Sequence, residues 1–162
     1  MGTIATGERR QALGGFAFAL ALFLLPHITI EAQGVAPAGS AVDSASLSVV
    51  RSYFAAYNTH DINAVLQFIS PDFVWLSLAG DSITVEVRGA QAVRAGLIDY
   101  FRRLPSAQSD IEAATTLGPW VSVRERARWV GANGPRSQAA LSVYEVRGGL
   151  LRRLWYYPEV RE

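Results

Sequence analysis

The clearest hydrophobic pattern lies in the last quarter of the chain, where polar and apolar side chains alternate over residues 120–130. One face of this run carries Val121, Val123, Glu125, Ala127 and Trp129. The other face carries Ser122, Arg124, Arg126 and Arg128. Such alternation predicts a β-strand with one buried and one solvated face.

Two more runs rich in aromatic and β-branched residues follow at 137–146 and 150–157. Gly148 and Gly149 separate them and supply the positive φ angles of a tight hairpin turn. The three runs therefore predict an antiparallel meander. Because such a sheet is unstable with its apolar face bare, the helical segments upstream are expected to cover it.

The upstream half predicts three helices. Leu47, Val50 and Tyr57 recur at helical spacing, so a first helix should start at Asp43 or Ser44 and end near residue 58. A second, short helix should run from an Asp61 cap to residue 68, stopped by the Ser-Pro-Asp sequence at 70–72. The third should begin after Gly89 and end before residue 105.

Three strands are expected between and after these helices, at residues 73–78, 83–88 and 109–117. In the first of them, Phe73, Trp75 and Ser77 share a face. The predicted order is helix, helix, β-hairpin, helix and four strands. It fits one domain over residues 46–160.

The N-terminal segment has the pattern of a secretory signal peptide over residues 1–32. Arg9 and Arg10 precede fourteen uncharged residues at 12–25, and small residues precede a cleavage site after Ala32. A retained membrane anchor is the alternative, although this run is shorter than the roughly 20 residues that span a bilayer. We expect export to the periplasm or medium, no stable membrane insertion after cleavage, and a flexible linker at 33–45.

The amino-acid composition limits the kinds of catalysis and binding that the chain can support. All 15 basic residues are arginine, which excludes a lysine Schiff base, and the net charge of +1 gives no general case for nucleic acid. Arg124, Arg126 and Arg128 are interpreted as a solvated strand face. His27 lies in the expected signal peptide, so His60 has no second His or Cys in the mature domain to share a metal. No glycine-rich phosphate loop is present either, so neither a metal nor a cofactor is expected.

The order of elements and several short motifs resemble the nuclear transport factor 2-like superfamily, and within it the SnoaL-like group. The motifs are residues 53–58 (YFAAYN), 60–61 (HD), 72–75 (DFVW), 88–89 (RG), 144–149 (YEVRGG) and 155–158 (WYYP). The resemblance implies an α+β fold in which three helices pack over a cone-shaped, curved mixed β-sheet and enclose an apolar pocket. The family includes ketosteroid isomerase, polyketide cyclases, limonene epoxide hydrolase, scytalone dehydratase and non-enzymatic binding domains, so the fold alone gives no function.

The ketosteroid isomerase pattern is only partly present. Its helix tyrosine falls on Tyr53, but the positions of its catalytic base and its protonated acid fall on Ser77 and Ser142. Since a serine hydroxyl is no base at neutral pH, that isomerase mechanism is expected to be absent. The Asp-Arg-Asp arrangement of the hydrolases has no counterpart on the strands.

Glu125 is the one acid on the apolar face of its strand, so it should point into the pocket with a raised pKa. The resemblance favours Arg153 facing inward as its partner, together with Trp155 and Tyr157. Three roles stay open for Glu125: a structural ion pair with Arg153, a ligand anchor, or a catalytic base with Tyr53 as hydroxyl donor. The expected ligand-binding set is Tyr53, Tyr57, Trp75, Ser77, Glu125, Ser142, Arg153, Trp155 and Tyr157.

These observations favour an exported domain that binds a small apolar or aromatic molecule. The first alternative is a cofactor-independent isomerase, cyclase or hydrolase that uses Glu125 and Tyr53. The second is an interaction module, with the outer sheet face and its arginine row as the partner surface. The resemblance also implies a homodimer formed through the sheet.

Overall fold

The computed structural model describes residues 41–161, so the expected signal peptide lies outside the described residues. The helices are α1 (Ala41–Asn58), α2 (Ile62–Leu66) and α3 (Ala90–Arg103). The strands are β1 (Ile69–Ala79), β2 (Ser82–Arg88), β3 (Gln108–Leu117), β4 (Trp120–Gly131), β5 (Gly134–Arg147), β6 (Leu150–Tyr156) and β7 (Val160–Arg161). Within residues 41–161, no helix is long and apolar enough to cross a membrane.

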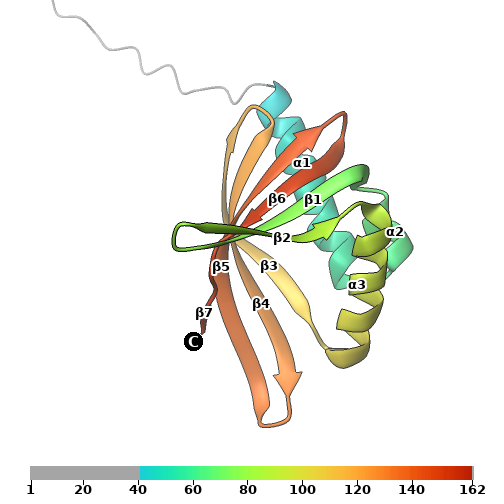
Figure 1. Ribbon diagram of the computed structural model, residues 1–162, viewed down its shortest axis with the longest axis vertical. Coiled ribbons are helices and arrows are strands. Elements are labelled where there is room, and N and C mark those ends of the chain that lie inside the picture. The colour runs from blue at the N-terminus through green and yellow to red at the C-terminus, as the bar shows by residue number, and fades with distance from the viewer. Residues whose placement is uncertain (1–40, 162) are drawn as a thin grey trace, which may run out of the picture. The chain divides into compact units, whose positions relative to one another are not determined.

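The strands form one mixed sheet in the order β2-β1-β6-β5-β4-β3, and β7 pairs with β5 beside this path (Figure 1). Among the strand pairs of residues 41–161, only the β1–β6 pair is parallel. The predicted meander is confirmed, since β4 pairs antiparallel with β5 and β5 pairs antiparallel with β6. Gly148 and Gly149 have φ values of 57° and 78° in the β5–β6 turn, as the hairpin prediction required.

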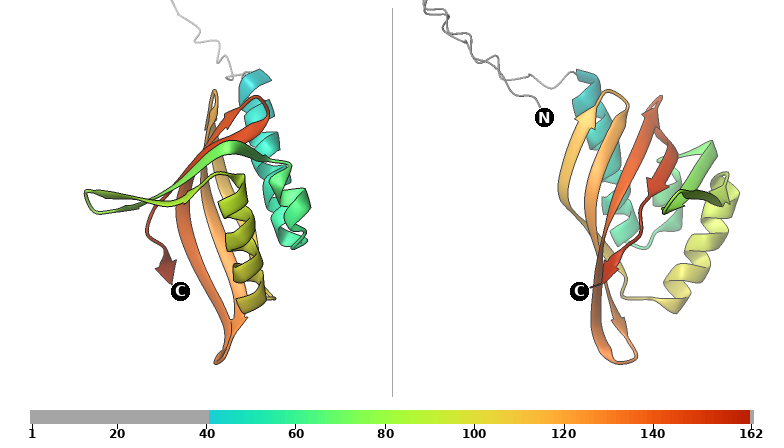
Figure 2. Two further views of the ribbon diagram at one scale, coloured as in Figure 1. Left: turned by 45° about the vertical axis from the view of Figure 1, so that its right-hand side comes forward. Right: turned by 60° about the vertical axis from the view of Figure 1, so that its left-hand side comes forward.

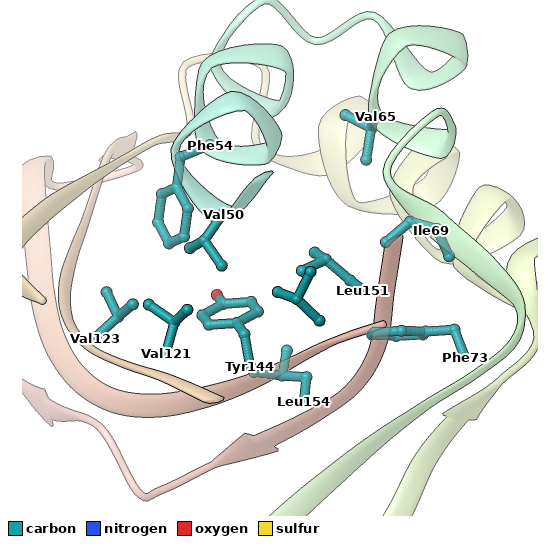
Figure 3. Close-up of a cluster of buried hydrophobic side chains, with 11 residues drawn as sticks. Val50, Phe54, Val65, Ile69, Phe73, Val121, Val123, Tyr144, Leu151 and Leu154 are labelled. Atoms are coloured by element: carbon teal, nitrogen blue, oxygen red, sulfur yellow. The ribbon is translucent and has the colours of Figure 1, made fainter. Parts of the chain in front are cut away.

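All three helices lie on the concave side of the curved sheet (Figure 2). Val50 and Phe54 of α1 point down onto Tyr144 of β5, and Val121 of β4 packs beside that ring (Figure 3). This is the α+β cone that the sequence predicted. One side of the sheet is covered and the other faces solvent.

Among the boundaries that differ from the prediction are the starts of α1 and β1 and the end of α2, which comes at Leu66 rather than at residue 68. Helix α1 begins at Ala41, so residues 41–45, which were assigned to the linker, are helical. Asp43 in its first turn accepts a hydrogen bond from the backbone N–H of Gly118, which ties this end of the helix to the β3–β4 turn. Strand β1 begins at Ile69 because the chain already pairs with β6 there, through a 2.7 Å bond from Leu151 N to Phe68 O. Residues 70–72 therefore lie within a strand.

The α1–α2 turn has structural roles for both of its polar residues. Asp61 caps α2, and its Oδ1 accepts from the backbone N–H groups of Asn63 at 2.9 Å and Ala64 at 3.1 Å, as predicted. His60 has a φ of 58°, and its Nε2 lies 2.6 Å from the carbonyl oxygen of Ala107. Its ring stacks on Phe101 at 4.1 Å. These contacts join the turn to the segment that leads into β3.

The arginine row of β4 lies on the outer sheet face but is matched by acids on β3. Arg124 and Arg126 both bind the Glu112 carboxylate, and Arg128 binds Asp110. Arg124 and Arg128 are solvated, as predicted, whereas the side chain of Arg126 is only 13% exposed. The positive charge of the row is largely neutralised within the sheet.

Candidate functional site

A cavity of about 510 Å³ opens between the helices and the concave face of the sheet. Most of its wall is aromatic or aliphatic, and its polar groups are mainly hydroxyls. The lining residues come from α1 (Tyr53, Phe54, Tyr57), α3 (Val93, Gly96, Leu97, Tyr100, Arg103), β1 and β2 (Ile69, Phe73, Trp75, Ser77, Val87), β3 and β4 (Ser109, Glu125, Ala127), and β5 to the C-terminal end (Gln138, Tyr144, Leu154, Tyr156, Glu159). Its size and composition are those of a small-molecule site.

Glu125 is the acid at the centre of this wall. The regular alternation of β4 turns it inward with Val121 and Val123, and its exposure is 8%. Its Oε2 accepts hydrogen bonds from the hydroxyls of Tyr144 at 3.0 Å and Ser142 at 3.3 Å. The inward orientation that the sequence predicted is confirmed.

Burial raises the pKa of Glu125, and hydrogen bonds from the hydroxyls of Tyr144, Tyr156 and Ser142 oppose this effect without cancelling it. Among residues 41–161, no Arg or His forms an ion pair with this carboxyl group. It is therefore held by hydroxyl groups alone. Such a group gains a proton more readily than an exposed glutamate does.

Tyr53 and Tyr57 stand one turn apart on α1, so both rings face the sheet. Burial, and secondarily the charge of Glu125, raises the pKa of Tyr53. Burial also raises the pKa of Tyr57, whose hydroxyl group bonds to that of Tyr100 on α3. Both side chains remain neutral at physiological pH and present hydroxyl groups near the buried acid.

Strand β1 supplies Trp75 and Ser77, and both line the cavity as predicted. The indole ring of Trp75 meets Tyr156 edge to face, with 5.9 Å between the ring centroids. Its Nε1 is buried and has no hydrogen-bond partner. Ser142 is fully buried beneath Glu125 rather than in the cavity wall.

The predicted inward orientation of Arg153 is wrong. Alternation breaks in β6, where Leu151 and Leu154 are both buried although they lie three residues apart, opposite a register shift between Glu145 and Val146 of β5. Arg153 consequently emerges on the outer face, where its guanidinium lies 2.9 Å from a Glu145 carboxylate oxygen. The Glu125–Arg153 pair does not exist.

Trp155 and Tyr157 were expected beside Arg153 and are likewise absent from the cavity wall. Trp155 pairs with Val143 and Leu76 in the sheet, and Tyr157 is 42% exposed. The shift in β6 turns Leu154 and Tyr156 inward in their place.

The sequence reasoning missed several polar groups of the cavity. Tyr144 stands two residues from Ser142 on the same strand, so the alternation that turned Ser142 inward also marked Tyr144. Tyr156 had no such signal, because only the irregularity of β6 turns it inward.

Glu145 lies on the outer face and not in the cavity, and Arg147 and Arg153 bind its carboxylate. Burial would raise the pKa of Glu145, but the two arginines together lower it.

Among the described residues, 41–161, no group of three His, Cys, Asp or Glu side chains could hold a metal ion. The cavity wall combines the buried Glu125 carboxyl group with neutral hydroxyls, and Glu159 and Arg103 also line it, so these residues support binding and proton transfer.

Solved structures with the same fold are numerous, whereas no curated protein matches the chain. One is a cystatin-fold protein from Novosphingobium aromaticivorans, with 24% identity, a TM-score of 0.58 and coverage of 68% of this chain and 96% of that one. Another is an LEH-like epoxide hydrolase from M. tuberculosis, with 17% identity, a TM-score of 0.61 and coverage of 71% and 83%. A third is IdmH, a polyketide cyclase candidate from Streptomyces antibioticus, with 18% identity, a TM-score of 0.60 and coverage of 72% and 91%.

At these identities the structural likeness establishes the fold alone. The sequence profile of the SnoaL-like domain matches residues 50–154, which span α1 to β6 and include nearly all of the cavity wall. The chain therefore belongs to the SnoaL-like domain family.

Proposed function

We propose that this protein binds a small, mainly apolar or aromatic molecule in the cavity between its helices and sheet. The observation that carries the proposal is a cavity of about 510 Å³ whose largely aromatic wall contains one central carboxyl group, Glu125. Apolar walls supply most of the binding energy of such sites, and a few fixed polar groups set the orientation of the ligand. Glu125 is the polar anchor in this proposal.

Trp75 supports the same proposal. A buried donor without a partner costs stability, typically about 1–3 kcal/mol, so it is an unusual feature in a cavity wall. A rotation of the indole ring that exposes this N–H to an acceptor on a ligand would remove that cost. The bound molecule would then be held between Trp75 and Glu125.

Native mass spectrometry of the purified protein, followed by extraction of bound molecules, tests this function. We expect an adduct on the wild-type protein that is weakened in Glu125→Gln and kept in Tyr157→Phe, whose ring is 42% exposed and outside the cavity wall. A wild-type protein without any adduct, from every host and extract tried, would count against the proposal.

Catalysis is a second candidate, favoured by the raised pKa of Glu125 and by the Tyr53 hydroxyl group beside it. Buried acids with raised pKa values in substrate-sized cavities are typical general bases. The structural neighbours include an epoxide hydrolase and a polyketide cyclase candidate. Incubation of the extracted molecule with wild-type protein and Glu125→Gln would reveal turnover, which should vanish in the variant while the fold is retained.

Homodimer formation through the outer sheet face is proposed as well. Leu141 and Trp120 are 55% and 42% exposed on that face. Trp155 lies on β6, the strand between β5 and β1. Such apolar surface is typical of an interaction site. Light scattering should give twice the monomer mass for the wild type and the monomer mass for Leu141→Glu.

Export is the remaining proposal, and it rests on the sequence of residues 1–32. Cell fractionation with the complete chain should place a shortened protein outside the cytoplasm. N-terminal sequencing that begins at Met1 or Gly2 in the cytoplasmic fraction would overturn it.

A further inference from the structure

The cavity has an unbalanced charge distribution. Two carboxyl groups line it, Glu125 and Glu159, against one cation, Arg103. The Arg103 guanidinium is already bound to Asp99 at 2.7 Å, and its side chain is 68% exposed. Because Glu159 has an interaction partner of its own and Arg103 is paired with Asp99, the electronegative character of the cavity rests on Glu125 in its ionised form.

Glu125 also keeps an acceptor position for a ligand. An ionised carboxylate accepts about four hydrogen bonds. The described protein donates three, from Ser142, Tyr144 and Tyr156. No arginine or histidine within residues 41–161 supplies the missing counter-charge. A buried carboxylate without a cation costs folding free energy. A ligand that supplies the cation removes this cost and binds more tightly for that reason.

The wall around Glu125 is suited to a cation in a second way. Aromatic side chains from α1, β1, β5 and β6 surround the acid, namely Tyr53, Tyr57, Phe73, Trp75, Tyr144 and Tyr156. The faces of aromatic rings attract ammonium groups, most strongly where water is excluded. A carboxylate ligand would instead bring a second negative charge to an unpaired one.

We propose that the molecule bound in this cavity is an apolar amine, whose protonated nitrogen lies against Glu125 and whose hydrocarbon body fills the aromatic remainder. This inference rests on the proposed function, because it names the class of molecule that the same cavity takes. The ammonium group donates to the carboxylate and completes its hydrogen bonding. No bond is made or broken in this step.

Isothermal titration calorimetry with three probes of the same shape tests the class: naphthylmethylamine, naphthylmethanol and naphthoate. We expect the amine to bind at least about tenfold more tightly than the alcohol, and the naphthoate to bind most weakly. Glu125→Gln should reduce the affinity for the amine to that for the alcohol. A wild-type-like far-ultraviolet circular dichroism spectrum and cooperative urea unfolding of that variant would show that it is folded.

The pH dependence in the wild-type protein gives a second readout that needs no variant. The amine requires an ionised Glu125, so its affinity should rise between about pH 5 and about pH 8 while the amine stays protonated. A neutral ligand that accepts a hydrogen bond from the protonated acid would show the opposite slope. The titratable or charged groups that face Glu125 or line the same cavity are Tyr53, Tyr57, Tyr100, Tyr144, Tyr156, Arg103 and Glu159.

Equal affinities for amine and alcohol, or an affinity for the amine that falls with rising pH, would overturn the amine proposal and leave the cavity's binding function standing. Failure of all three probes to bind would overturn both. Tighter binding of naphthoate would show that the electronegative description of the cavity is wrong.

Discussion

The hydroxyl group of Tyr144 lies 3.0 Å from Oε2 of Glu125 and donates its hydrogen bond to that carboxyl group, beneath the helices. Both side chains are buried, with exposures of 3% and 8%. The pair joins β5 to β4 at the point where the sheet surface becomes the cavity wall. Its disruption should therefore change both stability and the protonation of the acid.

Removal of this donor should raise the pKa of Glu125 further, because Tyr144→Phe takes away a bond that favours the charged form. The variant should also lose roughly 1–3 kcal/mol of unfolding free energy, the usual cost of a lost bond to a charged group. Carbon-detected NMR titration of Glu125 and urea denaturation give the two values. An unchanged or lowered pKa would contradict the assignment of Tyr144 as donor.

Glu125 should make the protein less stable as pH rises. Its pKa in the native state is raised above the ordinary value of 4.5, so between these two values the native state holds a proton that the unfolded state has released. Stability from this group is complete below about pH 4.5 and is lost as pH rises through the native pKa. The Glu125→Gln variant does not lose stability in this way, because the glutamine side chain does not titrate.

The unfolding free energy of Glu125→Gln minus that of the wild type should therefore increase from about pH 4 to about pH 8, by about 1.4 kcal/mol for each pH unit between the two pKa values. Urea denaturation of both proteins across this range measures it, and the subtraction removes the contribution of other acids such as Asp72 and Glu112. A difference that is constant with pH would show that the pKa of Glu125 is not raised.

Arg153 should matter for the outer sheet face and not for the cavity. Because its pair with Glu145 is 44% exposed on the arginine side, Arg153→Met should cost no more than about 1 kcal/mol in chemical denaturation. Retention of the bound molecule should be unchanged in native mass spectrometry. Tyr156→Phe, on the same strand but in the cavity wall, should weaken that retention.

Asp61 should contribute a measurable helix cap. Asp61→Ala removes the acceptor for two backbone N–H groups and should cost about 0.5–2 kcal/mol. Asp61→Asn keeps a side-chain oxygen and serves as the matched control, with a smaller loss. Thermal and urea unfolding compare the two, and equal losses would show that the cap is not the cause.

The sequence predicted what depends on local periodicity. Strand β4 pairs with β5 in regular steps, so simple alternation placed Glu125 correctly inside. Strand β6 breaks its alternation beside Leu151, where both neighbouring strands shift register: β1, far away in the chain, between Ile69 and Val74, and β5 between Glu145 and Val146. These register shifts leave no mark in the periodicity, which explains why Arg153 was placed inside and Tyr156 outside.

The cavity itself follows from packing that no single segment specifies. Tyr53 and Trp75 were predicted to share it because each lies on the apolar face of its own element. The contributions of Tyr100 and Arg103 depend on the position of α3 over the sheet edge. Gly89 fixes part of that position: its φ is 81°, its N–H donates to Phe73 O at 2.7 Å, and an added Cβ would lie 3.3 Å from Pro71 O.

The most direct test of the central claim is fluorescence titration with N-phenylnaphthylamine, a neutral dye that brightens in apolar cavities. Ala127→Phe fills the cavity from the inner face of β4, and Ser122→Phe adds the same side chain on the exposed face of that strand. We predict saturable binding of the dye to the wild type and to Ser122→Phe, and loss of binding in folded Ala127→Phe. Equal binding by all three proteins, or none by the wild type, would contradict the assignment of this cavity as the binding site.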